Sequence, residues 1–186
     1  MWEKACAKAL GDQLHTLLEK LPLPRPLGAD YMAATTLMSL IKKPEWHLVG
    51  TKSFSGNGTL IPDIAIFYRY REETLFLILD AKYYDPANLA QNHPGIEDID
   101  KQYLYEVAFK PFLDSHGVQQ VQNIFLLPTE GDNLEYRGYV EFTMLKNLGC
   151  ENIKIILLPA KRVFSSYLNE GSKDSLAKNL LDEVCK

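Results

Sequence analysis

The stretch LIPDIAIFYRYREETLFLILDAKYYD, residues 60–85, contains two apolar runs separated by a short polar segment. The two runs predict β-strands over residues 60–69 and 74–83. The polar RYREE between them predicts the turn of an antiparallel hairpin. Such a hairpin brings the beginning of the first strand next to the end of the second, and charged residues lie at both of these places.

The charged residues of the hairpin are expected to converge at one edge of a sheet. Asp63 begins one strand and Asp80 ends the other, while Lys82 shares a face with Asp80 because strand side chains alternate. Two adjacent carboxylates repel each other unless a cation lies between them. Oxygen ligands of this kind favour Mg²⁺, for which Mn²⁺ can substitute. We expect the main-chain carbonyl of Ala81 to be a third oxygen ligand.

A lysine beside such a metal suits phosphodiester hydrolysis. It can orient or deprotonate an attacking water and stabilise the charge that develops on phosphorus. Taken singly, a PD pair is common in turns, and a DAK triplet can be a solvated strand end. Charge at the end of runs as apolar as IAIF and LFLIL is costly to keep without a purpose. The combination therefore favours a functional site. The alternative is an unrelated α/β protein with a chance triad, which would be supported if residues 60–83 formed no hairpin.

Apolar periodicity predicts further elements along the chain. Helices are expected over 2–20, 29–41, 97–115, 161–169 and 172–185, and further strands over 46–52, 121–128, 137–143 and 152–158. Helices around a mixed central β-sheet make the chain an α/β protein. Its 186 residues suit a single domain covering 1–186.

Composition and charge limit the function classes. The chain is 46% hydrophobic and 24% charged, with no apolar run of transmembrane length and no apolar signal core at the N-terminus. Three scattered cysteines without a CxxC pair indicate reduced thiols, so a cytoplasmic location is expected. The net charge of -4 is unusual for a protein that grips DNA alone, because phosphate neutralisation dominates DNA affinity.

Several motifs resemble known nucleases. PD at 62–63 and DAK at 80–82 resemble the PD-(D/E)xK nuclease signature, whose members fold as a mixed sheet flanked by helices. LDAKYYD (79–85), GIEDIDKQYLYEVAF (95–109) and NIFLLPT followed by GYV (123–140) resemble the nuclease subunit of LlaJI restriction endonucleases, itself similar to the McrC component of McrBC systems. The resemblance implies a restriction-endonuclease-like fold and a Mg²⁺-dependent endonuclease that cleaves double-stranded DNA within a restriction system.

The resemblance also implies roles for individual residues. Asp63 and Asp80 resemble the metal ligands, and Lys82 resembles the catalytic lysine. Glu3 resembles the helix glutamate that completes the metal site in many such nucleases. An exposed carboxylate favoured by the dipole of the first helix is the alternative interpretation of Glu3.

The helix expected over 97–115 offers further candidates. Lys101 and Gln102 lie where related nucleases carry a glutamine followed four residues later by a tyrosine. Here Tyr105 follows Lys101 by four residues and Gln102 by three, which leaves open which of the two faces the site. Asp98 shares this helix face, so these side chains are expected to line one wall of a cleft, with an exposed helix surface as the alternative for Asp98.

Partners are expected for the complete reaction. The resembled subunits work with a GTP-hydrolysing AAA+ partner similar to McrB, and this chain has no phosphate loop of its own. No base-reading element is identifiable, so the isolated chain is expected to cut DNA feebly and without sequence choice. Double-strand cleavage needs two sites, which a homodimer or the partner would bring together. A non-catalytic nuclease-fold module for DNA binding or assembly is the alternative function, and the intact triad disfavours it.

Overall fold

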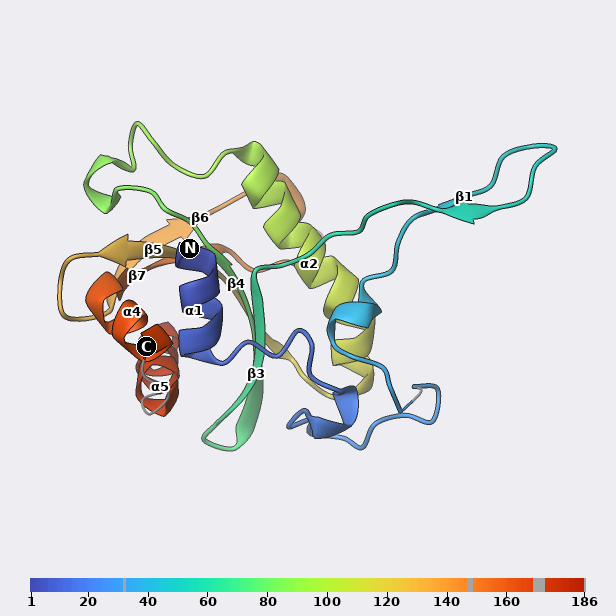
Figure 1. Ribbon diagram of the computed structural model, residues 1–186, viewed down its shortest axis with the longest axis horizontal. Coiled ribbons are helices and arrows are strands. Elements are labelled where there is room, and N and C mark those ends of the chain that lie inside the picture. Colours follow the sequence, from blue (N-terminus) through green and yellow to red (C-terminus); the bar gives the residue numbers. More distant parts are fainter. Residues whose placement is uncertain (32, 147–148, 169–172, 186) are drawn as a thin grey trace.

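The computed structural model of the protein describes residues 1–31, 33–146, 149–168 and 173–185 (Figure 1). Within these residues a mixed five-stranded sheet has the strand order β3-β4-β5-β7-β6. The strands are β3 (Ile64–Tyr70), β4 (Glu73–Ala81), β5 (Gln120–Thr129), β6 (Glu135–Val140) and β7 (Ile153–Pro159). Strands β4, β5 and β7 are parallel, and β3 and β6 pair antiparallel at the two edges. The expected hairpin and the α/β class are confirmed, although the strand expected over 60–69 begins only at Ile64, so Asp63 directly precedes it.

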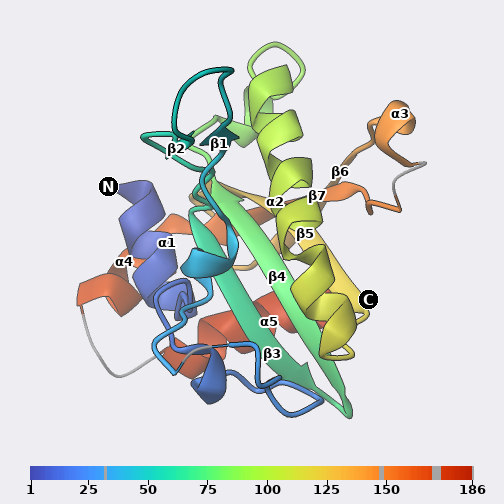
Figure 2. The ribbon, with the colours of Figure 1, turned by 90° about the vertical axis from the view of Figure 1, so that its right-hand side faces the viewer.

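Helices cover both faces of this sheet (Figures 1 and 2). One face lies under α1 (Trp2–Leu10), α4 (Ala160–Leu168) and α5 (Lys173–Val184), and the other under α2 (Ile96–Ser115). Connections contain the short helix α3 (Thr143–Lys146) and the 3₁₀ turns η1 (Leu18–Lys20), η2 (Met38–Leu40) and η3 (Pro86–Asn88). None of the helices in the described ranges is both long enough and apolar enough to cross a membrane.

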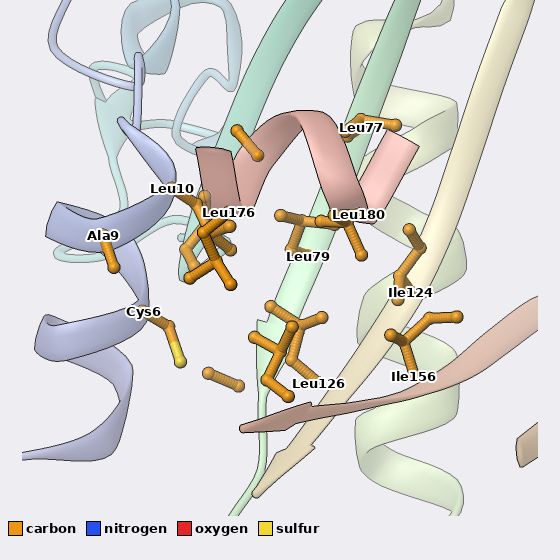
Figure 3. Packing of buried hydrophobic residues seen from close by; sticks show 14 of the residues in the cluster. Cys6, Ala9, Leu10, Leu77, Leu79, Ile124, Leu126, Ile156, Leu176 and Leu180 are labelled. Carbon is orange, nitrogen blue, oxygen red and sulfur yellow. The ribbon is translucent and has the colours of Figure 1, made fainter. Parts of the chain in front are cut away.

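The face under α1 and α5 holds a large apolar core (Figure 3). Cys6 of α1 and Leu176 and Leu180 of α5 pack against Leu77 and Leu79 of β4. All five side chains are at most 2% exposed. Because burying a Leu side chain contributes roughly 1.5–3 kcal/mol, this layer holds the first helix firmly against the sheet.

Strand β4 is buried on both faces, and its alternation sets the position of the charged residues. Leu77 and Leu79 face the core under α1, whereas Phe76 and Ile78 pack into the core under α2 with Phe109. Side chains alternate along a strand, so the next residue on the α2 side is Asp80. The apolar run therefore ends by directing a carboxylate into the space between the sheet and α2.

The expected helix over residues 2–20 is wrong beyond Leu10. Gly11 adopts a left-handed conformation with φ 77 and ends the helix. The chain then follows the free edge of β3, where Asp12 Oδ1 accepts from the Ala65 N–H at 3.0 Å. The Gln13 side chain likewise accepts from the Phe67 N–H at 2.8 Å. Covering an exposed strand edge outweighs the local helical spacing of the leucines.

The expected helix over 29–41 is also wrong. Among the described residues of this range only η2 is helical, and the main chain of this segment pairs with the segment after α1. The Leu18 N–H donates to Thr35 O at 3.0 Å, and the Leu37 N–H donates to Thr16 O at 3.1 Å. Leu37 is fully buried against the α2 side of the sheet. The apolar spacing arose from packing in an irregular segment.

In place of the strand expected over 46–52, the chain forms a projecting hairpin. Its strands are β1 (Glu45–Trp46) and β2 (Phe54–Ser55), which pair only with each other. In Figure 1 this hairpin extends away from the body of the protein, beyond α2. We call residues 42–59 the arm.

The remaining expectations are confirmed with small shifts of their ends. Helix α2 and strands β5 and β7 match 97–115, 121–128 and 152–158 to within two residues. Strand β6 ends at Val140, before the expected end of 137–143. Helices α4 and α5 confirm the two closing helices, while residues 169 and 172 lie outside the described part of the chain.

Candidate active site

Asp63 and Asp80 lie opposite each other at the end of the β3–β4 hairpin. The last register pair of the ladder is Ile64 with Leu79, so these two aspartates occupy the next opposed position. Opposed residues of an antiparallel pair have their Cβ atoms about 4.5–5.5 Å apart on one face of the sheet. Asp80 is 7% exposed and Asp63 is half-buried. The hairpin thus sets two carboxylates side by side in a largely desolvated place.

The main-chain groups of Ala81 face the same place. The Ala81 N–H donates to Asp63 Oδ2 at 3.0 Å, whereas the N–H of Lys82 donates to Leu126 O of β5. In antiparallel pairing, the N–H and C=O of one residue are directed to the same neighbour. The Ala81 carbonyl is therefore directed to the Asp63 side, beyond the last β3–β4 ladder pair.

The two carboxylates influence each other strongly. Burial, a hydrogen bond with Asp80 and the charge of Asp80 together raise the pKa of Asp63 to about 7. The N–H of Ala81 opposes this increase, and the charge of Glu3 adds a smaller increase. A carboxyl pair that holds a proton at neutral pH is a pair that a divalent cation would relieve.

Lys82 bridges the strand and the helix on the opposite side of the site. Its Nζ lies 2.9 Å from Asp80 Oδ2 and 2.8 Å from Oδ1 of Asp98 on α2. Burial alone lowers the pKa of Lys82, but the hydrogen bonds and charges of Asp98 and Asp80 raise it above its ordinary value. Lys82 is therefore a cation held in place by two carboxylates.

Helix α2 places its expected site residues in different environments. Asp98 is half-buried and reaches Lys82, whereas Lys101 is exposed. Gln102 is fully buried, and its Nε2 donates to Ile78 O of β4 at 2.8 Å. The expectation of one shared cleft wall is therefore wrong for Gln102, which is directed into the sheet where solvent has no access.

Tyr105 closes the inner end of the site. Its hydroxyl donates to Ile61 O at 2.9 Å, two residues before Asp63. Burial raises the pKa of Tyr105 to about 12, and the charges of Asp80 and Asp63 contribute to this increase. The hydrogen bond ties α2 to the segment that leads into β3 and fixes the approach of the chain to Asp63.

Glu3 lies at the outer side of the site. It is exposed, and its charge acts on Asp63 from the first turn of α1. A cavity of about 670 Å³ lies between the first residues of α1 and the end of β4. Its lining is formed by Met1, Trp2, Glu3, Ala81, Lys82, Tyr83, Tyr84 and Phe164. Glu3 and Lys82 thus face one concave space, although the residues were found 79 positions apart in the sequence.

Sequence reasoning missed Tyr83 and Tyr84 as part of this space. Both line the cavity, and Tyr83 is 78% exposed. Their adjacency to Lys82 in DAKYYD was the available signal, since aromatic side chains after a catalytic strand lie within reach of its ligand. Trp2 was also missed, because its place against the end of β4 depends on the packing of α1.

The donor set fits a cation that keeps part of its hydration. Among the described residues, no three His, Cys, Asp or Glu side chains gather closely enough to hold a metal by themselves. The site instead combines two opposed carboxylates with the Ala81 carbonyl. Mg²⁺ is usually held by one or two carboxylates, with waters and substrate phosphates completing its octahedron. The residues present therefore fit Mg²⁺ better than a metal that needs a full protein cage.

Comparison with known proteins supports a nuclease assignment of this geometry. A family model described as LlaJI restriction endonuclease matches residues 32–161. The chain is also similar to the Type II restriction enzyme BsuMI component YdjA of Bacillus subtilis (strain 168), with 32% identity over 146 residues. This alignment covers 74% of the chain and 30% of the relative, so the chain spans less than a third of the length of that protein. The family match includes Asp63, Asp80 and Lys82 and begins after α1.

Proposed function

The chain belongs to the LlaJI restriction endonuclease family, and from this premise we propose that it is a Mg²⁺-dependent endonuclease that hydrolyses DNA phosphodiester bonds. The observation that carries the proposal is the convergence of Asp63, Asp80 and Lys82 at one end of the β3–β4 hairpin. This convergence supports a PD-(D/E)xK site. A non-catalytic module would have no need of a buried carboxylate pair with a cation beside it.

Asp63, Asp80 and the Ala81 carbonyl would hold the metal ion. A bound Mg²⁺ would supply Lewis-acid stabilisation of the negative charge that develops on the phosphoryl group. Glu3 lines the adjoining cavity with Ala81 and Lys82, and its charge acts on Asp63, so it would contact the ion through water. Mn²⁺ takes similar oxygen ligands and would substitute for Mg²⁺.

Lys82 would act on the substrate side of the site. Its ammonium group is held between Asp80 and Asp98 at hydrogen-bond distance from both. From there it can donate to an attacking water or to a phosphate oxygen, and its charge stabilises the transition state without reorganisation. Asp98 is the positioning residue, because it holds Nζ in place without reaching the reacting atoms.

The proposal includes partners. The matched relative is named as a component of a restriction enzyme, which supports a subunit of a multi-component system acting on double-stranded DNA. The three scattered cysteines without a CxxC pair are the feature that favours the cytoplasm for this system. The net charge of -4 supports a partner that contributes DNA affinity. We propose a GTP-hydrolysing AAA+ subunit similar to McrB for this role, with two copies of the chain brought together for double-strand cleavage.

A plasmid-nicking assay in Mg²⁺ tests the proposed function. Lys82→Ala should lower the cleavage rate at least about 100-fold, since it removes a preorganised donor, and should leave Mg²⁺ binding nearly intact by calorimetry. Asp80→Ala should abolish both Mg²⁺ binding and cleavage. Lys110→Ala is the matched control, because this exposed lysine lies further along α2 than Tyr105 and pairs with Asp114. Cleavage by Lys82→Ala at the wild-type rate would overturn the assignment.

A further inference from the structure

The arm presents an exposed aromatic pair that is unusual for a surface hairpin. Trp46 and Phe54 oppose each other in β1 and β2, with their rings parallel to within 5° and centroids 6.2 Å apart. They are 53% and 51% exposed, and every residue of 42–55 is exposed. No segment in the described part of the chain covers these rings. Large apolar side chains left open in one place mark a contact surface.

Contacts within the arm hold it in shape. At its tip, the Thr51 N–H donates to Leu48 O at 3.2 Å. Between the tip and the ring pair, His47 Nδ1 and Ser53 Oγ lie 2.7 Å apart. The imidazole and hydroxyl continue the register of β1 and β2 by one position, on the face opposite the rings. The arm is thus a two-stranded ribbon with an aromatic face and a polar face.

The base of the arm is fastened to the body beside the candidate active site. Thr59 Oγ1 donates to Lys42 O at 3.0 Å and closes the two ends of the arm upon each other. Asp63 follows Thr59 by four residues. Between them, the carbonyl of Ile61 accepts a hydrogen bond from the Tyr105 hydroxyl. The arm therefore joins the body beside the site, and its hairpin of β1 and β2 extends outward from there (Figure 1).

The charge of the arm is opposite to that of the rest of the protein. Residues 42–59 contain Lys42, Lys43 and Lys52 against the single carboxylate of Glu45, which gives a net charge of +2. The whole chain carries -4, so the remainder carries -6. In a protein of acidic balance, the segment that leads into the site is basic, which favours a polyanionic partner.

We propose that the arm is a DNA-binding ribbon that enters a groove of the duplex beside the phosphodiester bond to be cut. This inference rests on the proposed function and names the element that holds the substrate. The major groove of DNA admits a two-stranded β-ribbon. The three lysines would contact phosphates along the groove edges, and the Trp46 and Phe54 rings would pack against its sugar and base wall.

A second copy of the chain fits this surface less well. Two arms that met through their ring faces would bring two basic segments together, and like charges across an interface cost binding energy. DNA instead complements both properties of the arm, its positive charge and its exposed rings.

Fluorescence anisotropy with a short labelled duplex tests the inference, using the full chain in Ca²⁺ at low salt. Replacing Lys42, Lys43 and Lys52 together by Gln should make the logarithmic salt dependence of binding shallower by about 3, because each phosphate contact contributes about 0.9. Trp46→Ala combined with Phe54→Ala should weaken binding about tenfold or more, as expected for lost aromatic contacts to DNA.

Matched variants separate a specific contact from a change in net charge. Exposed lysines elsewhere give the same charge change when replaced by Gln: Lys20, Lys110 and Lys178. Tyr139→Ala is the aromatic control, since Tyr139 is 56% exposed on β6 at the opposite edge of the sheet. The controls should bind like the wild type. Equal weakening by arm and control variants, or no binding of DNA by the wild type at the lowest salt, would overturn the inference.

The outcomes distinguish the arm from the active site. Arm variants that bind and nick DNA like the wild type would refute the arm proposal and leave the proposed function standing. DNA binding that depends on the arm, without any metal-dependent nicking, would support the arm proposal and refute the proposed nuclease function. Sedimentation of the wild type and the ring variants covers the remaining case: a dimer lost with Trp46 and Phe54 would assign the arm to a second copy and refute DNA binding.

Discussion

Helix α2, which carries Asp98 and Tyr105 to the site, is held on the sheet by a titratable contact. Nδ2 of Asn123 on β5 donates to Oε2 of Glu106 on α2. Glu106 is 7% exposed and Asn123 is 1% exposed. Burial raises the pKa of Glu106 from 4.5 to about 7, while a main-chain hydrogen bond from Glu151 opposes the increase and the charge of Glu151 adds a smaller one. We predict that Glu106→Gln, which keeps an acceptor for Asn123 and removes the charge, stabilises the protein above neutral pH.

The direction in which stability changes with pH follows from proton binding to Glu106. Between pH 4.5 and 7 the folded protein holds a proton on Glu106 that the unfolded chain has released, so stability falls as pH rises through this window. Each pKa unit corresponds to about 1.4 kcal/mol, and the full increase therefore costs the wild type at most about 3.5 kcal/mol above pH 7. For a chain of this size the cost corresponds to roughly 7–14 °C in melting temperature.

Thermal unfolding of the wild type and Glu106→Gln from pH 4.5 to 8 measures this cost. The two melting temperatures should be close at the acidic end, and the gap should open as pH rises and level off above pH 7. Glu97→Gln, an exposed glutamate in the first turn of the same helix, is the matched control and should follow the wild type. Parallel profiles for all three proteins would show that the charge on Glu106 does not destabilise the folded protein. A Glu106→Gln variant less stable than the wild type at pH 8 would show the same.

Three further predictions concern α2. Gln102→Ala should lower the free energy of unfolding by about 1–3 kcal/mol in urea titration, because it removes a buried hydrogen bond to Ile78 O; unchanged stability would contradict this. Lys101→Ala should leave the urea midpoint unchanged and lower the nicking rate, as expected for an exposed cation facing DNA, and an unchanged rate would make it an ordinary surface residue. Tyr105→Phe should lower the nicking rate while changing the free energy of unfolding little, because loss of the hydrogen bond to Ile61 O loosens the segment that leads to Asp63. Equal nicking rates in the wild type and Tyr105→Phe would contradict this prediction.

The fold of the hairpin and the identity of the triad were predictable from local sequence. Apolar runs of strand length fix β3 and β4, and the alternation along β4 directs Asp80 and Lys82 to one face. Once the two strands pair, Asp63 has no other neighbour at that position. The central part of the site thus depends on contacts within one supersecondary unit.

Other features depend on contacts between distant segments and were not predictable. The leucines after Leu10 have helical spacing, yet Asp12 and Gln13 bind the edge of β3, and no local pattern reveals that edge. Gln102 shares a helix face with Asp98 by spacing, but the closeness of α2 to β4 at that turn buries its amide against Ile78. The apolar spacing of residues 46–52 predicts a strand, yet only Trp46 of these residues is in a strand, and their side chains are exposed on a hairpin that projects from the body.

Diffraction from crystals soaked in Mn²⁺ tests most directly whether Asp63 and Asp80 form the metal site of a nuclease. We predict an anomalous scattering peak between the two carboxylates and the Ala81 carbonyl, at the octahedral oxygen site that suits Mg²⁺ and Mn²⁺. Asp80→Ala crystals should lack the peak, and Lys82→Ala crystals should keep it. A peak elsewhere in the protein, or none in wild-type crystals at saturating Mn²⁺, would contradict the claim.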